Sequence, residues 1–175
     1  MTVPEAPKKH TNNVEAHLPI SIFAYGTLKA GFANHDRFCR NAIDIRPAAT
    51  WGHLYDLGPY PALEIPESHI LAYGTADPLA DAQTQARLNA TTHTFSRPIG
   101  DWDLIQGELI TFPNPARDLP PNDQLEGFRV GGPCLYHRVI VGVWQDAKHC
   151  LAWVYSMNCR LNGIGRVHWT RGTSL

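Results

Sequence analysis

Two apolar segments, at 136–144 and 150–156, place the strongest constraint on the fold. Both are rich in β-branched and aromatic residues, and a short polar stretch separates them. This pattern is typical of an antiparallel β-hairpin. Further strands are predicted at 19–25, 50–56 and 104–112. Because the alternation gives each strand an apolar face, the five segments together predict one curved sheet or closed barrel.

Helices are predicted to be few and short. Asn34 is expected to cap a short helix at 35–39. Asp77 followed by Pro78 is typical of a helix start and predicts a helix to about residue 90. The chain lacks the regular strand–helix alternation of a parallel sheet, so a small closed or nearly closed sheet is favoured.

The length and composition favour one globular domain at 18–160. The chain has 175 residues, of which 43% are hydrophobic and 18% charged, as is ordinary for a folded domain. A polar leader with two prolines, at 1–17, is expected to be disordered. Residues 161–175 are interpreted as a C-terminal tail.

Charge and cysteine usage exclude several classes of partner. Fifteen basic residues face sixteen acidic ones, and without a basic stripe no nucleic acid is expected as partner. No apolar stretch is long enough to span a membrane, and the leader lacks the apolar region of a secretion signal. The four cysteines form no Cys-x-x-Cys pair and are interpreted as free thiols of a cytoplasmic protein.

The first candidate site lies where the strand at 19–25 meets Gly26. The residues Tyr25, Gly26, Thr27 and Leu28 form what we call the 25–28 loop. A strand that ends in glycine presents successive backbone N–H groups, which can hold a carboxylate or a developing oxyanion. An ordinary turn is the alternative interpretation. The motif is not of the glycine-rich kind that binds nucleotides.

The second candidate is Glu126. Pro120 and Pro121 are expected to start a short helical turn, and Gly127 is expected to end it. The carboxylate would then lie at a helix C-terminus, where the backbone dipole and partial burial both raise its pKa. A glutamate with a pKa of about 6–7 can accept and return a proton at neutral pH. A surface glutamate before a helix cap is the alternative.

The other polar residues are weaker candidates. Glu108 is expected to face solvent from the middle of a strand, and Asp123 is interpreted as a helix-start residue. The nine histidines show no metal-ligand spacing, and no Gly-x-Ser-x-Gly nucleophile motif is present. No metal or cofactor is therefore indicated.

Motifs distributed over residues 20 to 157 together resemble the gamma-glutamylcyclotransferase-like (AIG2-like) family. They are Tyr25-Gly-Thr-Leu-Lys29 with Gly31, Asn34 and His35, then Gly52-His-Leu-Tyr-Asp-Leu-Gly-Pro-Tyr-Pro-Ala-Leu63, Gly107-Glu-Leu109, Asp123-Gln-Leu-Glu-Gly-Phe128, Leu135-Tyr-His-Arg138 and Ala152-Trp-Val-Tyr155. Their shared order makes the resemblance more specific than any one motif.

The resemblance implies a fold and a function. The fold would be α+β, a small mixed β-barrel with short helices and a pocket at one end. The 25–28 loop would bind the glutamyl group and its oxyanion, Glu126 would be the general acid/base, and Tyr60 and Tyr136 would line the pocket. The partner would be a small γ-glutamyl amine or amino acid, converted without a cofactor to 5-oxoproline and a free amine.

The chain departs from the family pattern at two places. An insertion at 66–103 is expected to lie outside the barrel near the pocket mouth, where it would influence the choice of substrate. The proline-rich segment 113–121 replaces the family's leucine-rich helix before Glu126. Two alternatives stay open: an enzyme acting on another γ-glutamyl compound, and a non-catalytic domain of the same fold that binds a small metabolite or a partner.

Overall fold

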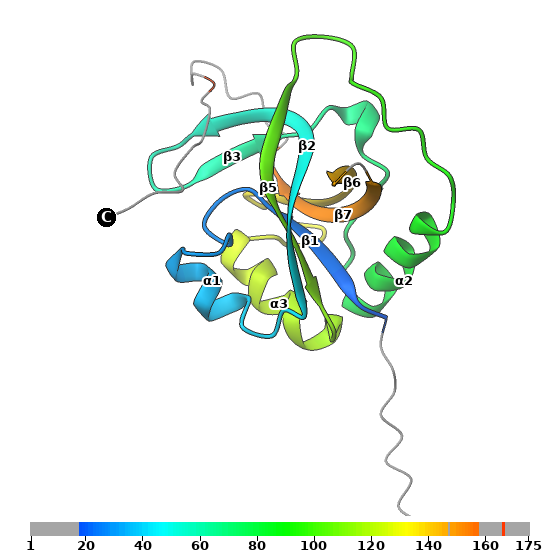
Figure 1. Cartoon of the computed structure of the whole chain (residues 1–175). Helices are drawn as coiled ribbons and strands as arrows, with labels where there is room; N and C mark the ends of the chain where they lie inside the picture. The colour runs from blue at the N-terminus through cyan, green and yellow to red at the C-terminus, as the bar shows by residue number, and fades with distance from the viewer. Residues whose placement is uncertain (1–17, 147, 158–165, 167–175) are drawn as a thin grey trace, which may run out of the picture.

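The computed structural model describes residues 18–146, 148–157 and 166. Its frame is a seven-stranded sheet in the order β3-β2-β5-β1-β7-β6-β4 (Figure 1). The strands are β1 (Ile20–Ala24), β2 (Asp44–Asp56), β3 (Pro61–Glu64), β4 (Ala72–Tyr73), β5 (Asp103–Phe112), β6 (His137–Gln145) and β7 (Lys148–Ser156). The helices are α1 (Ala33–Phe38), the 3-10 turn η1 (Glu67–His69), α2 (Pro78–Asn89) and α3 (Pro115–Glu126).

The sheet closes on itself. Ala49 of β2 pairs with Trp144 of β6, so that β2, β5, β1, β7 and β6 form a ring of five strands. β1 and β7 run parallel, with Ile22 opposite Trp153, whereas the other pairings are antiparallel. The prediction of an α+β fold built on a small mixed barrel is confirmed, and the barrel contains all five predicted strands.

Alternation along β1 divides the interior into two apolar clusters. Ile20 and Ile22 belong to a cluster that also includes Ala82 of α2 and Leu119 of α3, and it therefore fills the space between barrel and helices. Phe23 belongs to a second cluster, whose members come from all five barrel strands and which fills the barrel interior. Both faces of β1 are buried, and this fixes its register firmly.

α1 begins two residues earlier than expected, and its cap differs from the prediction. Phe32 is the N-cap residue and makes no side-chain capping bond. Asn34 lies inside the helix instead, and its side-chain amide donates a hydrogen bond of 2.9 Å to the Thr27 hydroxyl. The prediction that Asn34 caps α1 is therefore wrong, and Asn34 ties the helix to the 25–28 loop.

α2 begins where the sequence predicts. The Asp77 side chain accepts from the N–H groups of Leu79 and Ala80, and Pro78 occupies the first turn. The helix packs against the start of β1, because Gln85 accepts from the Ser21 N–H and donates to the Ser21 carbonyl.

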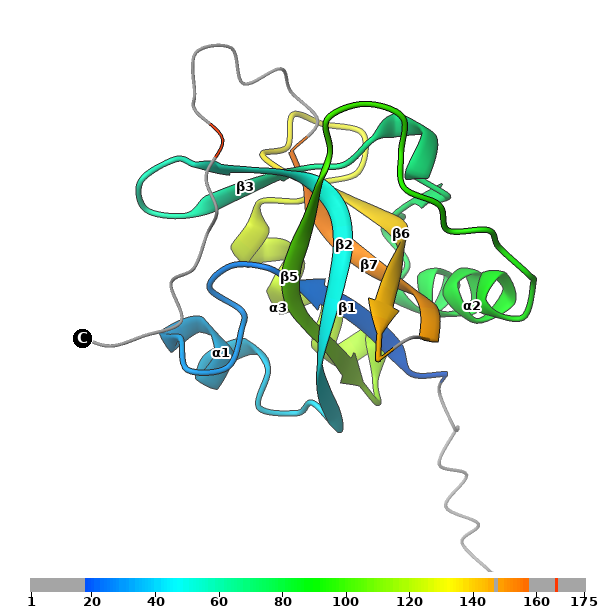
Figure 2. The same cartoon turned by 45° about the horizontal axis from the view of Figure 1, so that its top comes forward.

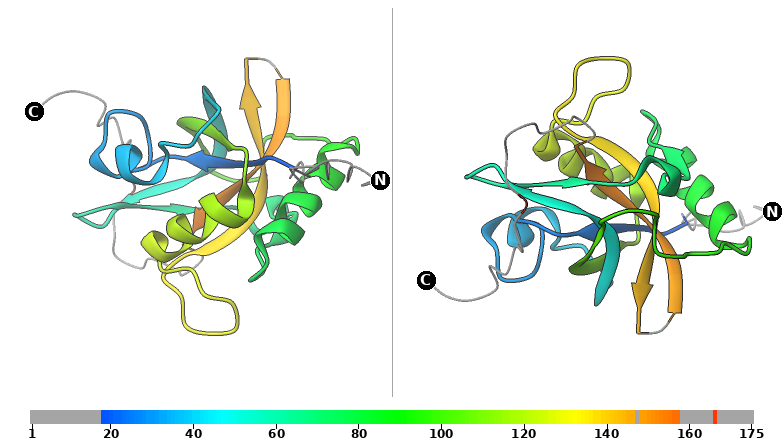
Figure 3. Two further views of the ribbon diagram at one scale, coloured as in Figure 1. Left: turned by 90° about the horizontal axis from the view of Figure 1, so that it is seen from below. Right: turned by 90° about the horizontal axis from the view of Figure 1, so that it is seen from above.

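α2 packs at the start of β1, whereas the 25–28 loop follows the end of β1. In Figures 1 and 3, α1 and α2 lie on opposite sides of the barrel. Figure 2 shows the connection from α2 to β5 running alongside β6, where Phe95 covers Gly142. The prediction that this insertion lies near the pocket mouth is wrong for these parts.

α3 is longer than predicted. It begins at Pro115, and the Asn114 side chain caps it by accepting from the Arg117 N–H. Pro120 and Pro121 lie inside the helix rather than at its start, so two backbone hydrogen bonds are missing there. Both prolines and the residues four positions before them are exposed, and water can satisfy the carbonyl groups that lose a partner.

Candidate active site

A cleft opens at the end of the barrel where β1 runs into the 25–28 loop. Its space, counting the part open to solvent, is about 350 Å³. The lining residues are Phe23, Ala24, Tyr25, Gly26, Thr27, Leu28, Tyr60, Pro61, Glu126, Tyr136 and Tyr155. Among the described residues, Glu126 is the one charged side chain of this lining, and it lies among four tyrosine rings.

Glu126 is the last residue of α3. Gly127 follows with φ 65°, a left-handed conformation that favours glycine and ends the helix as predicted. Burial raises the pKa of Glu126 from 4.5 to about 7, because the charged form loses the solvation of water. The raised pKa predicted from the sequence is confirmed, with burial as its cause. The carboxyl group therefore exchanges its proton closer to neutral pH than an exposed glutamate does.

The 25–28 loop lines the cleft and carries backbone donors that no described residue uses. Lys29 N–H donates to the Gly26 carbonyl and closes a turn. Within the described part of the chain, the N–H groups of Gly26, Thr27 and Leu28 donate no hydrogen bond. Three such groups on one loop that lines a cleft can bind a carboxylate or an oxyanion.

Two neighbours hold the 25–28 loop in place. A Cβ on Gly26 would lie 2.9 Å from Pro61 Cγ, so only glycine fits there without a shift. Glu108 is half-buried, and its carboxylate accepts from the Ala30 N–H at 2.8 Å. The side chain is in contact with solvent, as predicted, and it also supports the 25–28 loop through this exposed hydrogen bond.

Tyrosines make the walls of the cleft rigid. The Tyr25 hydroxyl donates to the Tyr155 carbonyl at 2.7 Å, and the Tyr136 hydroxyl donates to the Pro61 carbonyl at 2.9 Å. Tyr60 is 39% exposed at the mouth, with its ring 6.5 Å from that of Tyr136. Burial, then the nearby Tyr136 and Glu126, raise the pKa of Tyr25 well above its ordinary value, so its hydroxyl stays protonated.

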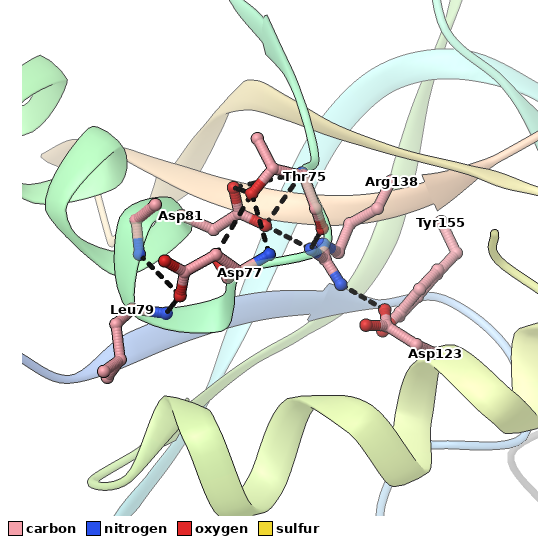
Figure 4. A network of polar contacts seen from close by, with 8 residues as sticks. Thr75, Asp77, Leu79, Asp81, Asp123, Arg138 and Tyr155 are labelled. Atoms are coloured by element: carbon pink, nitrogen blue, oxygen red, sulfur yellow. Dashed lines mark hydrogen bonds and ion pairs between the residues drawn. The ribbon is translucent and has the colours of Figure 1, made fainter. Parts of the chain in front are cut away.

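Tyr155 and its partner Asp123 were not singled out as site residues by the sequence analysis. Tyr155 lines the cleft, and its hydroxyl donates to Asp123 Oδ1 at 2.7 Å. Asp123 lies in the last turn of α3 and not at a helix start, so that interpretation was wrong. Arg138 pairs with the same carboxylate (Figure 4). The motifs at 123–128, 135–138 and 152–155 were the one sequence signal that included all three residues.

No metal site is evident in the described part of the chain, where no three His, Cys, Asp or Glu side chains gather as ligands. Cys39, Cys134 and Cys150 carry free thiols, as predicted. Burial and the nearby Glu108 raise the pKa of Cys39 to about 12, so this thiol is unreactive at neutral pH. Cys159 lies outside the described residues.

No described helix combines the length and apolar character needed to cross a bilayer. The predicted leader at 1–17 lies outside the described residues, as does the tail at 161–175 apart from Arg166.

Fold and cleft together define a small closed-barrel protein with a protonatable carboxylate and unused backbone donors in a tyrosine-walled cleft. Residues 22–92 match the family model described as gamma-glutamyl cyclotransferase, AIG2-like, which confirms the resemblance drawn from the motifs. The matched segment contains the 25–28 loop and Tyr60, and it ends before Glu126. A search of curated proteins finds no match.

Two solved structures are similar to the chain. One is YkqA from Bacillus subtilis, with 21% identity over 85% of this chain and a TM-score of 0.48. The chain spans 38% of the length of that protein. The other is an AIG2-like protein from Mus musculus, with 14% identity over 87% of this chain and 88% of the other, and a TM-score of 0.48.

Proposed function

We propose that the protein is a γ-glutamyl cyclotransferase that acts on a small γ-glutamyl amide. In this reaction the α-amine of the glutamyl group attacks its own γ-carbonyl carbon. A five-membered ring closes, the bond to the leaving amine breaks, and 5-oxoproline and a free amine result. Both reacting groups belong to one folded substrate, so their proximity supplies a large part of the rate enhancement.

The observation that carries the proposal is the carboxyl group of Glu126, which lies among four tyrosines in the cleft beside the 25–28 loop and whose pKa is raised to about 7. The attacking ammonium must lose a proton, and the leaving amine must gain one. A group with a pKa near the working pH can perform both transfers in turn. Among the described residues of the lining, no other charged side chain competes for this role.

The unused N–H groups of Gly26, Thr27 and Leu28 support the second part of the mechanism. As the amine attacks, negative charge develops on the γ-carbonyl oxygen. Backbone donors that are already oriented stabilise that charge without reorganisation. The family match over residues 22–92 includes this loop, and the rigid walls formed by Tyr25 and Tyr136 favour a small substrate.

The test is a panel of γ-glutamyl amides incubated with the wild type and with Glu126→Gln, with 5-oxoproline measured by mass spectrometry. The substitution keeps shape and hydrogen bonding but removes the proton acceptor. Turnover should therefore fall by about 10²–10⁴-fold while substrate binding survives. The matched control is Glu67→Gln, a change at an exposed glutamate outside the cleft, which should keep normal turnover.

Undiminished turnover by Glu126→Gln would contradict the acid/base role. If the wild type bound γ-glutamyl compounds without releasing 5-oxoproline, the non-catalytic binding domain would be the better description.

A further inference from the structure

Arg138 of β6 is fully buried and pairs with carboxylates from two different helices. Its guanidinium forms ion pairs with Asp81 of α2 and Asp123 of α3 (Figure 4). It also donates to the Thr75 carbonyl at 2.9 Å. The planar guanidinium lies over the ring of Phe128, 4.6 Å from its centroid. One side chain thus joins the barrel, the insertion and the helix that carries Glu126.

The contacts of Arg138 bracket Glu126 along the chain. Asp123 precedes Glu126 by three residues, so both belong to the last turn of α3, and Phe128 follows Glu126 by two residues. The Phe128 N–H donates to the Asp123 carbonyl at 2.9 Å and closes the end of the helix. Arg138 therefore fixes the backbone on both sides of the candidate acid/base.

The same carboxylate reaches the wall of the cleft. Asp123 accepts from the Tyr155 hydroxyl, and the Tyr155 carbonyl accepts from the Tyr25 hydroxyl, both at 2.7 Å. The groups that surround Glu126 are thus linked to Arg138 through hydrogen bonds, although Arg138 does not line the cleft.

The other anchor of Arg138 belongs to the insertion. Asp81 is 1% exposed, and its carboxylate accepts from the backbone N–H and the hydroxyl of Thr75. No residue of the described cleft lining comes from 66–103. Any effect of the insertion on catalysis is therefore expected to act through the ion pair between Asp81 and Arg138, and not through contact with the substrate.

We propose that Arg138 is a positioning residue that holds the Glu126 carboxylate in the cleft, and that the insertion stabilises this arrangement through Asp81. The effect on turnover rests on the proposed function, whereas the effect on the carboxylate itself does not. An arginine is required because its rigid fork pairs with two carboxylates at once and its flat face fits against an aromatic ring. A lysine keeps the charge but cannot form both contacts in that geometry.

The test is Arg138→Lys, examined by steady-state kinetics and by NMR titration of the Glu126 carboxyl carbon, assigned through its loss in Glu126→Gln. A small displacement of a catalytic group is costly, so kcat should fall by about 10–100-fold. KM should change less than kcat, by about twofold at most, because Arg138 is not among the residues that line the cleft.

The titration separates positioning from a general loss of stability. Because burial raises the pKa of Glu126 to about 7, a loosened helix end that admits water should move the midpoint down toward 4.5. The other titratable or charged groups that face Glu126 or its supports are Tyr25, Tyr60, Tyr136, Tyr155, Asp123 and Asp81. The positive charge is retained in Arg138→Lys, so a downward shift reports hydration.

Asp118→Asn is the matched control, since Asp118 of α3 is buried like Asp81 but pairs with Arg117, Asn41 and the Asn114 N–H and not with Arg138. It should leave the Glu126 midpoint unchanged. If Arg138→Lys fails to fold, Asp81→Asn removes the anchor on the insertion and should lower the midpoint in the same direction.

An unchanged Glu126 midpoint in the variants that fold, or an equal shift in Asp118→Asn, would overturn the proposal. If the wild type turns over no γ-glutamyl amide, the proposed function fails, but the titration still decides whether Arg138 positions Glu126.

Discussion

Replacement of Glu126 by glutamine should change the pH dependence of stability as well as turnover. The folded protein binds a proton at Glu126 more tightly than the unfolded chain does, because burial raises its pKa from 4.5 to about 7. The wild type therefore gains stability from this proton at low pH. It loses that contribution as the pH rises from about 4.5 to about 7, and above that range the loss is constant.

The size of the effect follows from the two pKa values. Each pKa unit corresponds to about 1.4 kcal/mol, so the free energy of unfolding lost by the wild type across this range is about 3 kcal/mol. Glutamine does not ionise, so the free energy of unfolding of Glu126→Gln does not include this loss. Relative to the wild type, Glu126→Gln should gain about 3 kcal/mol between pH 4.5 and pH 8.

The assay is urea unfolding of both proteins at intervals between pH 4.5 and pH 8. The remaining titratable groups are common to both proteins and cancel in the difference between their free energies of unfolding. An offset at pH 4.5 measures the change in packing, and the growth of the difference above pH 4.5 measures the ionisation of Glu126 alone. A difference that stays constant across the range would refute the claim that burial raises the pKa of this carboxyl group.

Three glycine substitutions test the neighbouring geometry. Gly26→Ala places a Cβ 2.9 Å from Pro61 Cγ, so it should displace the 25–28 loop and raise KM, and an unchanged KM would argue against this loop as the binding site. Gly127→Ala forces alanine into φ 65° and should destabilise the protein by about 1 kcal/mol in urea unfolding. Gly142→Ala brings a Cβ within 2.2 Å of Phe95. Because Phe95 must then move off β6, proteolysis of the 91–100 connection should be faster while kcat/KM stays normal. A large loss of kcat/KM would show that this connection affects the candidate site.

Local patterns were sufficient to predict much of the frame. The five barrel strands were predicted because each has an apolar face, and in the structure each contributes to a buried cluster. The start of α2 was predicted because Asp77 and Pro78 act on the backbone within one helical turn. The end of α3 at Gly127 was predicted because a left-handed glycine after the last helical residue is also a local signal.

The rest depended on contacts between distant parts of the chain. The start of α3 was misplaced because Pro120 and Pro121 resemble a helix beginning, and the exposed face that tolerates them is visible only in the folded protein. Arg138 and Asp81 are 57 residues apart in the sequence, so no local sequence pattern predicts that they form an ion pair. Glu126 was singled out from its place before Gly127, whereas Asp123, Arg138 and Tyr155 lay in the quoted motifs but were given no supporting role.

The parallel pairing of β1 with β7 has a consequence for how the cleft forms during synthesis. The 25–28 loop is made early, but it extends from a strand whose neighbour ends at Ser156. Until β7 has been synthesised, β1 lacks that neighbour, and Tyr25 lacks the Tyr155 carbonyl that fixes its ring. Such long-range pairings make folding slow relative to local structure. A nascent chain that already contains the whole family match at 22–92 therefore has a loop of the right sequence but no cleft to bind with.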